Sequence, residues 1–305
     1  MGIRGLAVAV SLAALPVADE TIEPLVARTY DVAAGEKAVV AAAEAGLVTY
    51  SPDGARRAGI VALPGSALRV AVAGDLAWVA LGPDGVAAVS VADPAAPRLV
   101  GRLATRSSAV GVAVEGSRVY VAEGSAGLSI LDASDPAAPR RVGALAVGDY
   151  CRGVAVSGGL ALVAASGSGL VTVDVRDPAK PRRLGILQLG GAAQDAAIVR
   201  DGLAIVAAGE RGAFLVDVSN PAYPAARGVV PAKDFVRGTA VAIGGATVAL
   251  ADGSGGVAIA SIADPDAPSV TRRFATKGQA VRVAFRSGGT WLAAADASGL
   301  AVVAE

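Results

Sequence analysis

Three charged residues recur at the same point of consecutive repeats in this sequence. Arg152, Asp195 and Arg237 each stand at the start of a predicted inner strand. If those strands line one channel, the three side chains face one another at its mouth. Two guanidinium groups beside a carboxylate can bind an anionic group or the acidic side chain of a partner. The other interpretation is structural, because the three charges can also satisfy one another and only seal the ring.

The loops before these residues differ from repeat to repeat. One loop carries Tyr150 beside Arg152, and another carries Phe235 beside Arg237. Aromatic residues together with arginine are typical of protein-binding hot spots. We therefore expect another protein as the partner. The candidate partner-binding residues are Tyr150, Arg152, Asp195, Asp234, Phe235, Arg237 and Arg282.

The composition argues against most catalytic and metal-dependent chemistry. The sequence contains no histidine, which removes the usual general base, the Ser-His-Asp triad and most zinc sites. The single cysteine, Cys151, cannot form an intramolecular disulfide and is interpreted as a small buried hydrophobic residue. We predict no enzyme activity, no catalytic residue, no metal and no cofactor. The alternative is a hydrolase or lactonase-like enzyme whose metal is held at the channel mouth by Asp149, Asp195 and Asp234.

Charge and hydrophobicity limit the remaining partners. Of the 305 residues, 53% are hydrophobic and 18% are charged, which indicates a large folded core rather than disorder. The 27 basic and 27 acidic residues cancel, whereas nucleic acids and anionic membranes select a basic surplus. We therefore expect no nucleic-acid partner. We also expect no membrane span, because polar or turn residues interrupt the apolar runs after the N-terminal segment.

Two markers repeat along the chain at intervals of about 42 residues. The first is a hairpin turn of two small residues, found at Gly35-Glu36, Gly74-Asp75, Gly116-Ser117, Gly158-Gly159, Asp201-Gly202, Gly244-Gly245 and Gly288-Gly289. The second is an Asp/Asn-Pro-x-x-Pro turn, which begins at Asp93, Asp135, Asp177, Asn220 and Asp264. Aspartate or asparagine before proline starts turns, and proline cannot donate to a sheet ladder. Both markers are therefore expected between strands.

Each repeat contains four short predicted strands. In the third repeat they fall at 109–114, 118–122, 128–132 and 140–145. Four antiparallel strands in a repeat of about 40 to 45 residues are typical of a propeller blade. The predicted fold is therefore all-β, a seven-bladed β-propeller of four-stranded antiparallel blades. We expect small residues on the inner strands, apolar residues on the third strands and solvated arginines on the outer strands.

The third strands and the proline turns that follow them resemble the LVIVD repeat. The segments 127–132, 169–174 and 212–217 read Gly-Leu-Ser-Ile-Leu-Asp, Gly-Leu-Val-Thr-Val-Asp and Gly-Ala-Phe-Leu-Val-Asp. The resemblance covers roughly residues 31 to 305. It implies a propeller fold and bacterial or archaeal surface or exported proteins, and it implies no activity. One departure concerns an acidic residue that the family often has after the second strand. It is present as Glu123 and Asp252 but replaced by Leu81, Ala165 and Ala208.

The two ends of the chain complete the prediction. The last predicted strand, 299–305, is a third strand, so we expect an N-terminal strand within 19–25 to close the ring as its missing neighbour. Residues 1–18 resemble a signal peptide, with one positive charge and an apolar core over 5–15. The propeller domain then spans 19–305. The alternative for the leader is a buried strand at 6–10.

These features predict an exported, periplasmic or cell-surface propeller that acts as a protein-interaction scaffold in a larger assembly. If the leader is a strand, the protein is cytoplasmic instead. Besides the enzyme, a further alternative is a structural subunit of a surface lattice or filament. Neutral charge and an apolar composition favour that alternative.

Overall fold

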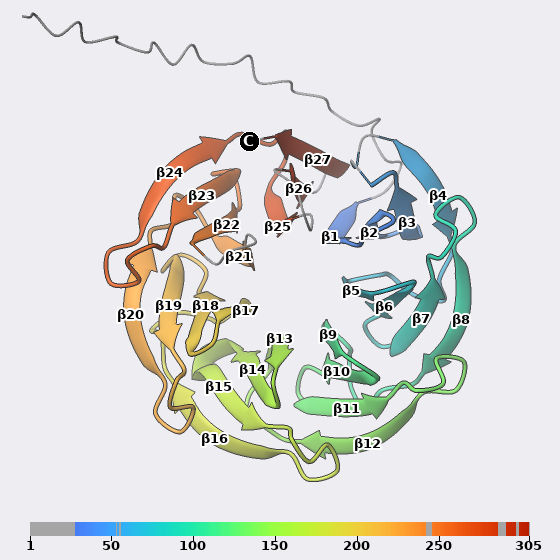
Figure 1. Ribbon diagram of the computed structural model, residues 1–305, viewed down its shortest axis with the longest axis horizontal. Helices are drawn as coiled ribbons and strands as arrows, with labels where there is room; N and C mark the ends of the chain where they lie inside the picture. Colours follow the sequence, from blue (N-terminus) through green and yellow to red (C-terminus); the bar gives the residue numbers. More distant parts are fainter. Residues whose placement is uncertain are drawn as a thin grey trace, which may run out of the picture.

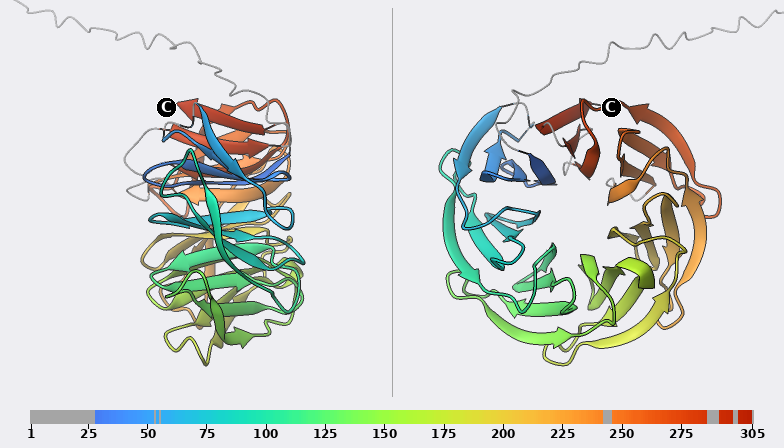
Figure 2. Two further views of the ribbon diagram at one scale, coloured as in Figure 1. Left: turned by 90° about the vertical axis from the view of Figure 1, so that its right-hand side faces the viewer. Right: turned by 180° about the vertical axis from the view of Figure 1, so that it is seen from behind.

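The computed structural model describes residues 28–52, 54, 56–241, 246–285, 291–296 and 299–304 of the chain. Seven antiparallel sheets stand around a common axis, in the arrangement of a propeller (Figure 1). Seen edge-on, the ring is a short cylinder (Figure 2). Six sheets, here called blades 1 to 6 in chain order, have four strands each, and the last sheet has three.

The strands follow one another with few residues between them. Blade 1 contains β1 (Thr29–Ala34), β2 (Val39–Ala43), β3 (Gly46–Tyr50) and β4 (Arg57–Val61). Blade 2 contains β5 (Arg69–Ala73), β6 (Leu76–Ala80), β7 (Val86–Ser90) and β8 (Arg98–Leu103). Blade 3 contains β9 (Gly111–Glu115), β10 (Arg118–Ala122), β11 (Leu128–Asp132) and β12 (Arg140–Leu145). Blade 4 contains β13 (Cys151–Ser157), β14 (Leu160–Ala165), β15 (Gly169–Asp174) and β16 (Arg182–Leu187). Blade 5 contains β17 (Asp195–Arg200), β18 (Leu203–Ala207), β19 (Ala213–Asp217) and β20 (Ala225–Val230). Blade 6 contains β21 (Val236–Val241), β22 (Thr247–Asp252), β23 (Val257–Ser261) and β24 (Ser269–Phe274). The three-stranded sheet contains β25 (Ala280–Phe285), β26 (Trp291–Asp296) and β27 (Gly299–Ala304).

Within each sheet the strands pair in chain order, and each strand is antiparallel to the next. The first strand lies next to the axis, and the fourth strand of each blade lies at the rim (Figure 1). Three strands of blade 3 have the predicted bounds, and the first spans Gly111–Glu115 instead of 109–114. The prediction of an all-β propeller with four-stranded antiparallel blades is confirmed for blades 1 to 6.

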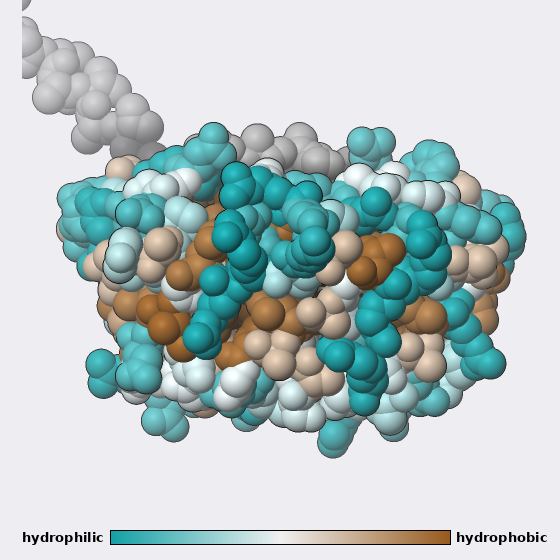
Figure 3. All heavy atoms as spheres, turned by 90° about the horizontal axis from the view of Figure 1, so that it is seen from below, coloured by the Kyte–Doolittle hydropathy of each residue, from teal (hydrophilic) through white to brown (hydrophobic). Residues whose placement is uncertain are grey.

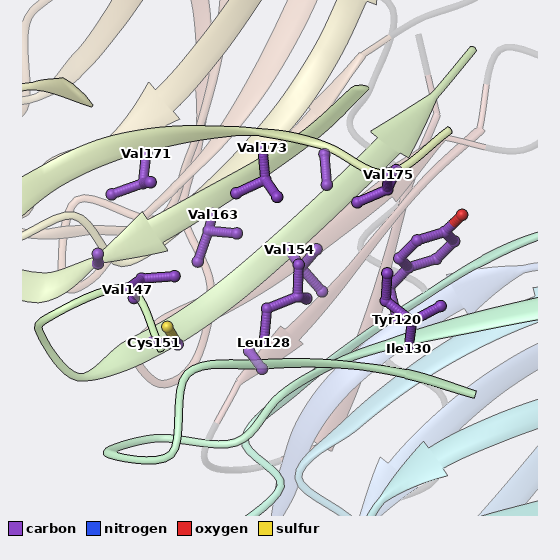
Figure 4. Packing of buried hydrophobic residues seen from close by; sticks show 13 residues of the cluster. Tyr120, Leu128, Ile130, Val147, Cys151, Val154, Val163, Val171, Val173 and Val175 are labelled. Atoms are coloured by element: carbon purple, nitrogen blue, oxygen red, sulfur yellow. The ribbon is translucent and has the colours of Figure 1, made fainter. Parts of the chain in front are cut away.

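Small and branched apolar side chains fill the space between neighbouring blades. Tyr120, Leu128 and Ile130 of blade 3 form one buried cluster with Val154 of blade 4 (Figure 4). Burying a side chain of this size stabilises a fold by about 1.5–3 kcal/mol. Cys151 belongs to the same cluster, as predicted for a small hydrophobic residue, and burial raises the pKa of its thiol to about 12. The blades are therefore joined face to face by apolar packing.

At the rim, a glycine of the outer strand receives the proline turn of the next blade. A Cβ atom on Gly143 of β12 would overlap the carbonyl oxygen of Pro178 in blade 4. Thr172 of blade 4 adds a hydrogen bond across the next boundary, since its hydroxyl donates to the carbonyl oxygen of Pro221 at 2.5 Å. The same glycine contact joins Gly59 to Pro94, Gly101 to Pro136, Gly185 to Pro221 and Gly228 to Pro265. Glycine is required there because backbone meets backbone.

The outward surface of the outer strands is mixed in character. Arg140, Arg182 and Arg183 are exposed there, as predicted for rim arginines, and Ile186, further along β16, is 45% exposed. The space-filling view of this side shows bands of hydrophilic side chains between apolar ones (Figure 3). The charged bands interrupt the apolar surface, which opposes edge-to-edge aggregation.

The last sheet corrects the prediction of seven four-stranded blades closed by an N-terminal strand. Only β25, β26 and β27 form this sheet, and no N-terminal strand pairs with β27 within the described residues. The first described strand, β1, is instead the inner strand of blade 1. The prediction is wrong because it assumes that a missing fourth strand must be supplied. Face-to-face packing joins the sheets instead, and Leu300 of β27 shares a buried cluster with Val39 and Tyr50 of blade 1.

Two predicted N-terminal segments lie outside the described residues, namely the signal peptide at 1–18 and the closing strand at 19–25. Helical structure in the described part of the chain is limited to one turn of 3-10 helix, η1 (Ser166–Ser168), between β14 and β15. Among those residues, no helix has the length and apolar character needed to cross a membrane.

Candidate binding site at the mouth of the ring

Seven equivalent positions of the inner strands form one layer around the axis, near the end of the ring where these strands begin. We call this end the mouth and these positions the axial layer. Each position pairs with an alanine in the second strand of its sheet. In chain order the residues are Asp31, Arg69, Gly111, Gly153, Asp195, Gly238 and Arg282. The axial layer thus holds two acids, two bases and three glycines.

The charges of the axial layer pair across the ring. Arg69 of blade 2 contacts Asp195 of blade 5, with 3.4 Å between Nη1 and Oδ1. Asp31 of blade 1 accepts a hydrogen bond from the backbone nitrogen of Val70 at 2.8 Å. Arg282 of the three-stranded sheet places its Nε 3.8 Å from Oδ1 of Asp31. These contacts connect four sheets, two of which, blades 2 and 5, are not neighbours in the ring.

Two glycines of the axial layer leave room for these side chains. A Cβ atom on Gly153 would lie 2.9 Å from Oδ1 of Asp195, and one on Gly238 would lie 2.8 Å from Cδ of Arg282. Both distances are shorter than ordinary van der Waals contact. A long or charged side chain at one position therefore depends on glycine at the position beside it.

Burial sets the protonation of the two acids in the axial layer. Burial raises the pKa of Asp31 to about 6, although the charge of Arg69 and backbone hydrogen bonds oppose the rise. Burial also raises the pKa of Asp195, where Arg69 opposes the rise and the charge of Asp31 adds to it. Arg69 therefore acts on both carboxylates in a place with little solvent, and Arg282 is a second positive charge beside Asp31. These contacts agree with the structural interpretation of Asp195, in which its charge is paired with other charges of the ring.

Arg152 and Arg237 do not belong to the axial layer. A β-bulge lies at the start of the inner strand in blades 4 and 6, and each arginine is the extra residue of the bulge. The prediction that both arginines share one register with Asp195 is therefore wrong, because a bulge shifts the register by one residue. Arg152 is exposed at the mouth, where its Nε donates to the hydroxyl of Ser166 at 2.8 Å.

Each bulged arginine lies over the aromatic residue two positions before it. The Cζ atom of Arg152 is 5.4 Å from the centre of the Tyr150 ring, and that of Arg237 is 4.8 Å from the centre of the Phe235 ring. Contacts of this kind contribute about 0.5–1 kcal/mol at exposed sites. We call them the aromatic–arginine pairs. The structure thus brings each arginine into contact with the aromatic residue beside which it stands in the sequence.

The aromatic rings rest on glycines of the preceding blade. A Cβ atom on Gly124 or on Gly209 would lie 2.8 Å from the ring of Tyr150 or of Phe235, respectively. Isolated β-bridges at the same two glycines connect blade 3 to blade 4 and blade 5 to blade 6. Both rings are thus placed by the backbone of a neighbouring sheet, and Tyr150 remains 38% exposed.

The loop acids near the pairs are held by backbone groups. Asp149 accepts hydrogen bonds from the backbone nitrogens of Tyr150 at 2.6 Å and Ser168 at 2.7 Å, and these bonds lower its pKa. Asp234 accepts one from the backbone nitrogen of Ser254 at 2.7 Å, which lowers its pKa in the same way. Both carboxylates therefore organise loops and stay ionised.

The enzyme alternative requires Asp149, Asp195 and Asp234 to share a metal. Asp195 instead contacts Arg69, while the other two acids bind separate loops. No group of three or more potential metal-ligating side chains occurs among the residues that the structure describes. The structure does not bring the three carboxylates together.

Two further buried acids stand at the ends of second strands. Glu123 lies 3.4 Å from Nη2 of Arg141. Asp252 lies 2.6 Å from Nη1 of Arg273 and accepts a hydrogen bond from the backbone nitrogen of Lys233 at 2.7 Å. These acids tie the loop that enters the inner strand to their own blade. Blades without such an acid hold that loop by other contacts.

The sequence prediction missed Asp31 and Arg69. Alignment of the inner strands by their second-strand alanines places both residues level with Asp195, so the signal was present in the repeat. Arg282 was predicted and does lie in the axial layer. Its Nη1 donates to the backbone carbonyl oxygens of Arg237 and Val281, the latter at 2.7 Å. Arg282 therefore links the axial layer to one aromatic–arginine pair.

Fold and repeat pattern together define a β-propeller built from repeated four-stranded units. The sequence pattern of the LVIVD repeat matches residues 64–105, 107–146, 148–187 and 190–230, which together make up more than half of the chain. The chain therefore belongs to the LVIVD repeat family. A comparison with curated proteins finds no match.

Several solved structures share the fold at low sequence identity. The structure of U3-55K superimposes with a TM-score of 0.79 at 11% identity, over 93% of this chain and 97% of that one. A chain of the mitotic checkpoint complex gives 0.77 at 13% identity, over 100% and 99%. The β-propeller domain of Myceliophteria thermophila Cps50 (Swd1) gives 0.73 at 12% identity, over 91% and 96%. At these identities the likeness concerns the fold alone.

Proposed function

We propose that this protein is an interaction scaffold that binds a partner protein over the mouth of blades 4 to 6. The observation that carries the proposal is the pair of bulged arginines. Arg152 and Arg237 form no salt bridge with a carboxylate among the described residues, although each lies over an aromatic ring. Arginine and aromatic side chains presented together are the residue types that dominate protein interfaces.

The contacts within the axial layer support the same proposal. Its acids and bases contact one another across the ring, so they are occupied within the fold. A partner is therefore expected to meet the bulges and loops above the layer rather than the layer itself. One similar structure belongs to the mitotic checkpoint complex, and that likeness of fold supports a scaffold role by analogy only.

The proposal is tested by affinity capture from the cells that make the protein. The bait is the full chain, compared with Arg152→Ala/Arg237→Ala and with the rim control Arg98→Ala/Arg183→Ala. We expect one or more partners to be lost with the mouth variant and kept with the rim variant. Identical partner sets for all three baits would remove the mouth as the docking surface. A melting temperature for each bait excludes unfolding as the cause of a loss.

We further propose that the protein is exported, on the basis of the signal-like sequence of residues 1–18. Fractionation of the native cells, with N-terminal sequencing of the recovered protein, tests this. A mature chain that begins near residue 19 supports export. Recovery of intact residues 1–18 in the cytoplasmic fraction contradicts it.

A further inference from the structure

We infer that the partner presents an acidic, extended peptide segment, whose carboxylates bind the two aromatic–arginine pairs. This inference rests on the proposed function and adds the chemistry of the partner. It follows from a difference between the acids and the bases of the loops around the mouth of blades 4 to 6.

The acids in these loops are mostly occupied within the fold. Asp149 and Asp234 accept hydrogen bonds from loop backbone nitrogens. Asp252 is buried and contacts Arg273, and Asp195 contacts Arg69. Asp195 and Asp252 are therefore paired with arginines inside the fold, whereas Asp149 and Asp234 remain ionised and are held by loop backbone. The charge of Asp234 also acts on Arg237, but the two side chains form no salt bridge.

The bases of the same loops outnumber the acids that are not paired with an internal arginine, namely Asp149, Asp234 and Glu210. Arg152 and Arg237 are joined by Lys233, in the loop before β21, and by Arg211, in the turn between β18 and β19. None of the four has a salt bridge within the described part of the chain. Glu210, beside Arg211, is the nearby acid without a described internal partner. The patch thus has a local positive surplus on a chain of zero net charge.

The form of the two pairs favours carboxylates on a peptide. Both guanidinium groups lie over rings, those of Tyr150 and Phe235, and the Nε of Arg237 is buried without a hydrogen-bond partner among the described residues. A planar guanidinium group binds a carboxylate through two parallel hydrogen bonds. Because the pairs stand on blades 4 and 6 with blade 5 between them, one ligand that reaches both must be extended. The aromatic rings add apolar contact for the peptide itself.

The inference is tested with synthetic peptides and the purified full chain. The probe is a fluorescein-labelled ten-residue peptide of alternating glutamate and serine, and its control has glutamine in place of glutamate. Fluorescence anisotropy gives Kd for the unmodified chain, for Arg152→Gln/Arg237→Gln and for the rim control Arg98→Gln/Arg183→Gln. Arg152→Gln alone is the second variant, because this exposed side chain can change without loss of the fold.

We expect the glutamate peptide to bind and the glutamine peptide not to bind. Loss of both mouth arginines should weaken the affinity about tenfold or more, as for charged interface anchors, and the rim control should change it less than about twofold. Equal binding by the rim and mouth variants, or no binding of the glutamate peptide, would overturn the inference. Inorganic tripolyphosphate and a ten-nucleotide single-stranded RNA are competitors, and equally strong binding of either would identify a general polyanion site and also overturn it.

The outcomes separate this inference from the proposed function. If a partner is captured through the mouth but the glutamate peptide does not bind, the proposed scaffold function is supported and the inference of an acidic peptide is rejected. If the mouth substitutions do not change which partners are captured, the mouth is rejected as the docking site, regardless of the result with the peptide.

Discussion

The rim and the axial layer of this ring are built on opposite plans. At the rim, the outer-strand glycine of each of blades 1 to 5 makes the same contact with the proline turn of the next blade, as at Gly143 and Pro178. In the axial layer, seven equivalent positions hold acids, bases and glycines in no repeated order, as Asp31, Arg69 and Gly111 show. At the rim, the outer strand of a repeat packs against the next repeat alone. Near the axis, the side chains of all seven sheets lie close to one another.

The amino-acid sequences of the repeats can differ more near the axis than at the rim. A rim contact involves only two neighbouring blades, so one local solution can be copied. An axial residue such as Arg69 contacts blade 5, which is remote in the ring, so its type depends on the whole set of partners. Sequence differences between repeats at the mouth therefore reflect contacts that each blade makes with the others. The bulges in blades 4 and 6 place the candidate binding residues at this end of the ring.

Removal of the cross-ring arginine should have the largest effect on stability. Arg69→Ala leaves Asp195 and Asp31 buried beside each other without their shared positive charge. Breaking a buried ion pair costs about 3–5 kcal/mol. We expect a loss in the free energy of unfolding of this size at pH 7, measured by urea denaturation. The control Arg152→Ala, at an exposed site, should lower it by only about 1 kcal/mol, the size of its exposed contact with the Tyr150 ring. Equal effects of the two substitutions would contradict the distinction between the axial layer and the bulge.

A side chain at a rim glycine should have the next largest effect. Gly143→Val places atoms against the Pro178 carbonyl, and such overpacking costs about 1–3 kcal/mol, or more where backbone must move. The control is Arg272→Val, because Arg272 occupies the equivalent position of blade 6 and no glycine is needed there. Thermal unfolding of the two variants measures the difference. A melting temperature lowered as much by Arg272→Val as by Gly143→Val would refute the proline-turn contact as the reason for glycine.

The axial acids should give the smallest effect, a dependence of stability on pH. The folded pKa of Asp31 is about 6, above its ordinary value of 3.8, so its contribution to stability is present at low pH and lost as pH rises through 6. The free energy of unfolding should fall by about 1–2 kcal/mol between pH 5 and pH 8. Asp195, whose pKa is also raised, changes in the same direction.

The control for the pH effect is Asp31→Asn, which cannot ionise and should reduce the fall between pH 5 and pH 8 to the part contributed by Asp195. The exposed loop acids do not interfere in this range. The pKa of Asp132, lowered to about 2 by hydrogen bonds from Ser134, makes its contribution disappear only in more acidic solution. A profile that rises with pH, or one that Asp31→Asn leaves unchanged, would show that the axial layer does not carry the effect.

Much of the fold could be predicted because the signals are local and repeated. Glycine and proline turns define the ends of strands, so the strands at 118–122, 128–132 and 140–145 were placed at their observed bounds. Closure of the ring could not be predicted by counting strands. It depends on packing between distant faces, as between Leu300 and Val39, and a count of strands contains no information on such packing.

The candidate site was predicted in part for a similar reason. Tyr150, Arg152, Phe235 and Arg237 stand together in two short segments, so their association was visible in the sequence. The placement of both arginines outside the axial layer was not visible, because a bulge adds one residue without a sequence mark of its own. Asp31 was missed because its partners lie in other sheets.

Local sequence signals are enough to specify the all-β repeat, the inner and outer strands and the turns between them. These follow from periodic apolar residues and from the backbone limits of glycine and proline, which act within a few residues. The contacts between charged residues, in contrast, depend on how the sheets are arranged around the axis. Arg69 and Asp195 are 126 positions apart, and they come into contact because seven sheets converge on one axis. Salt bridges across the ring exist because the sheets close around the axis. Within the described residues, the two bulged arginines at the mouth form no salt bridge with a carboxylate.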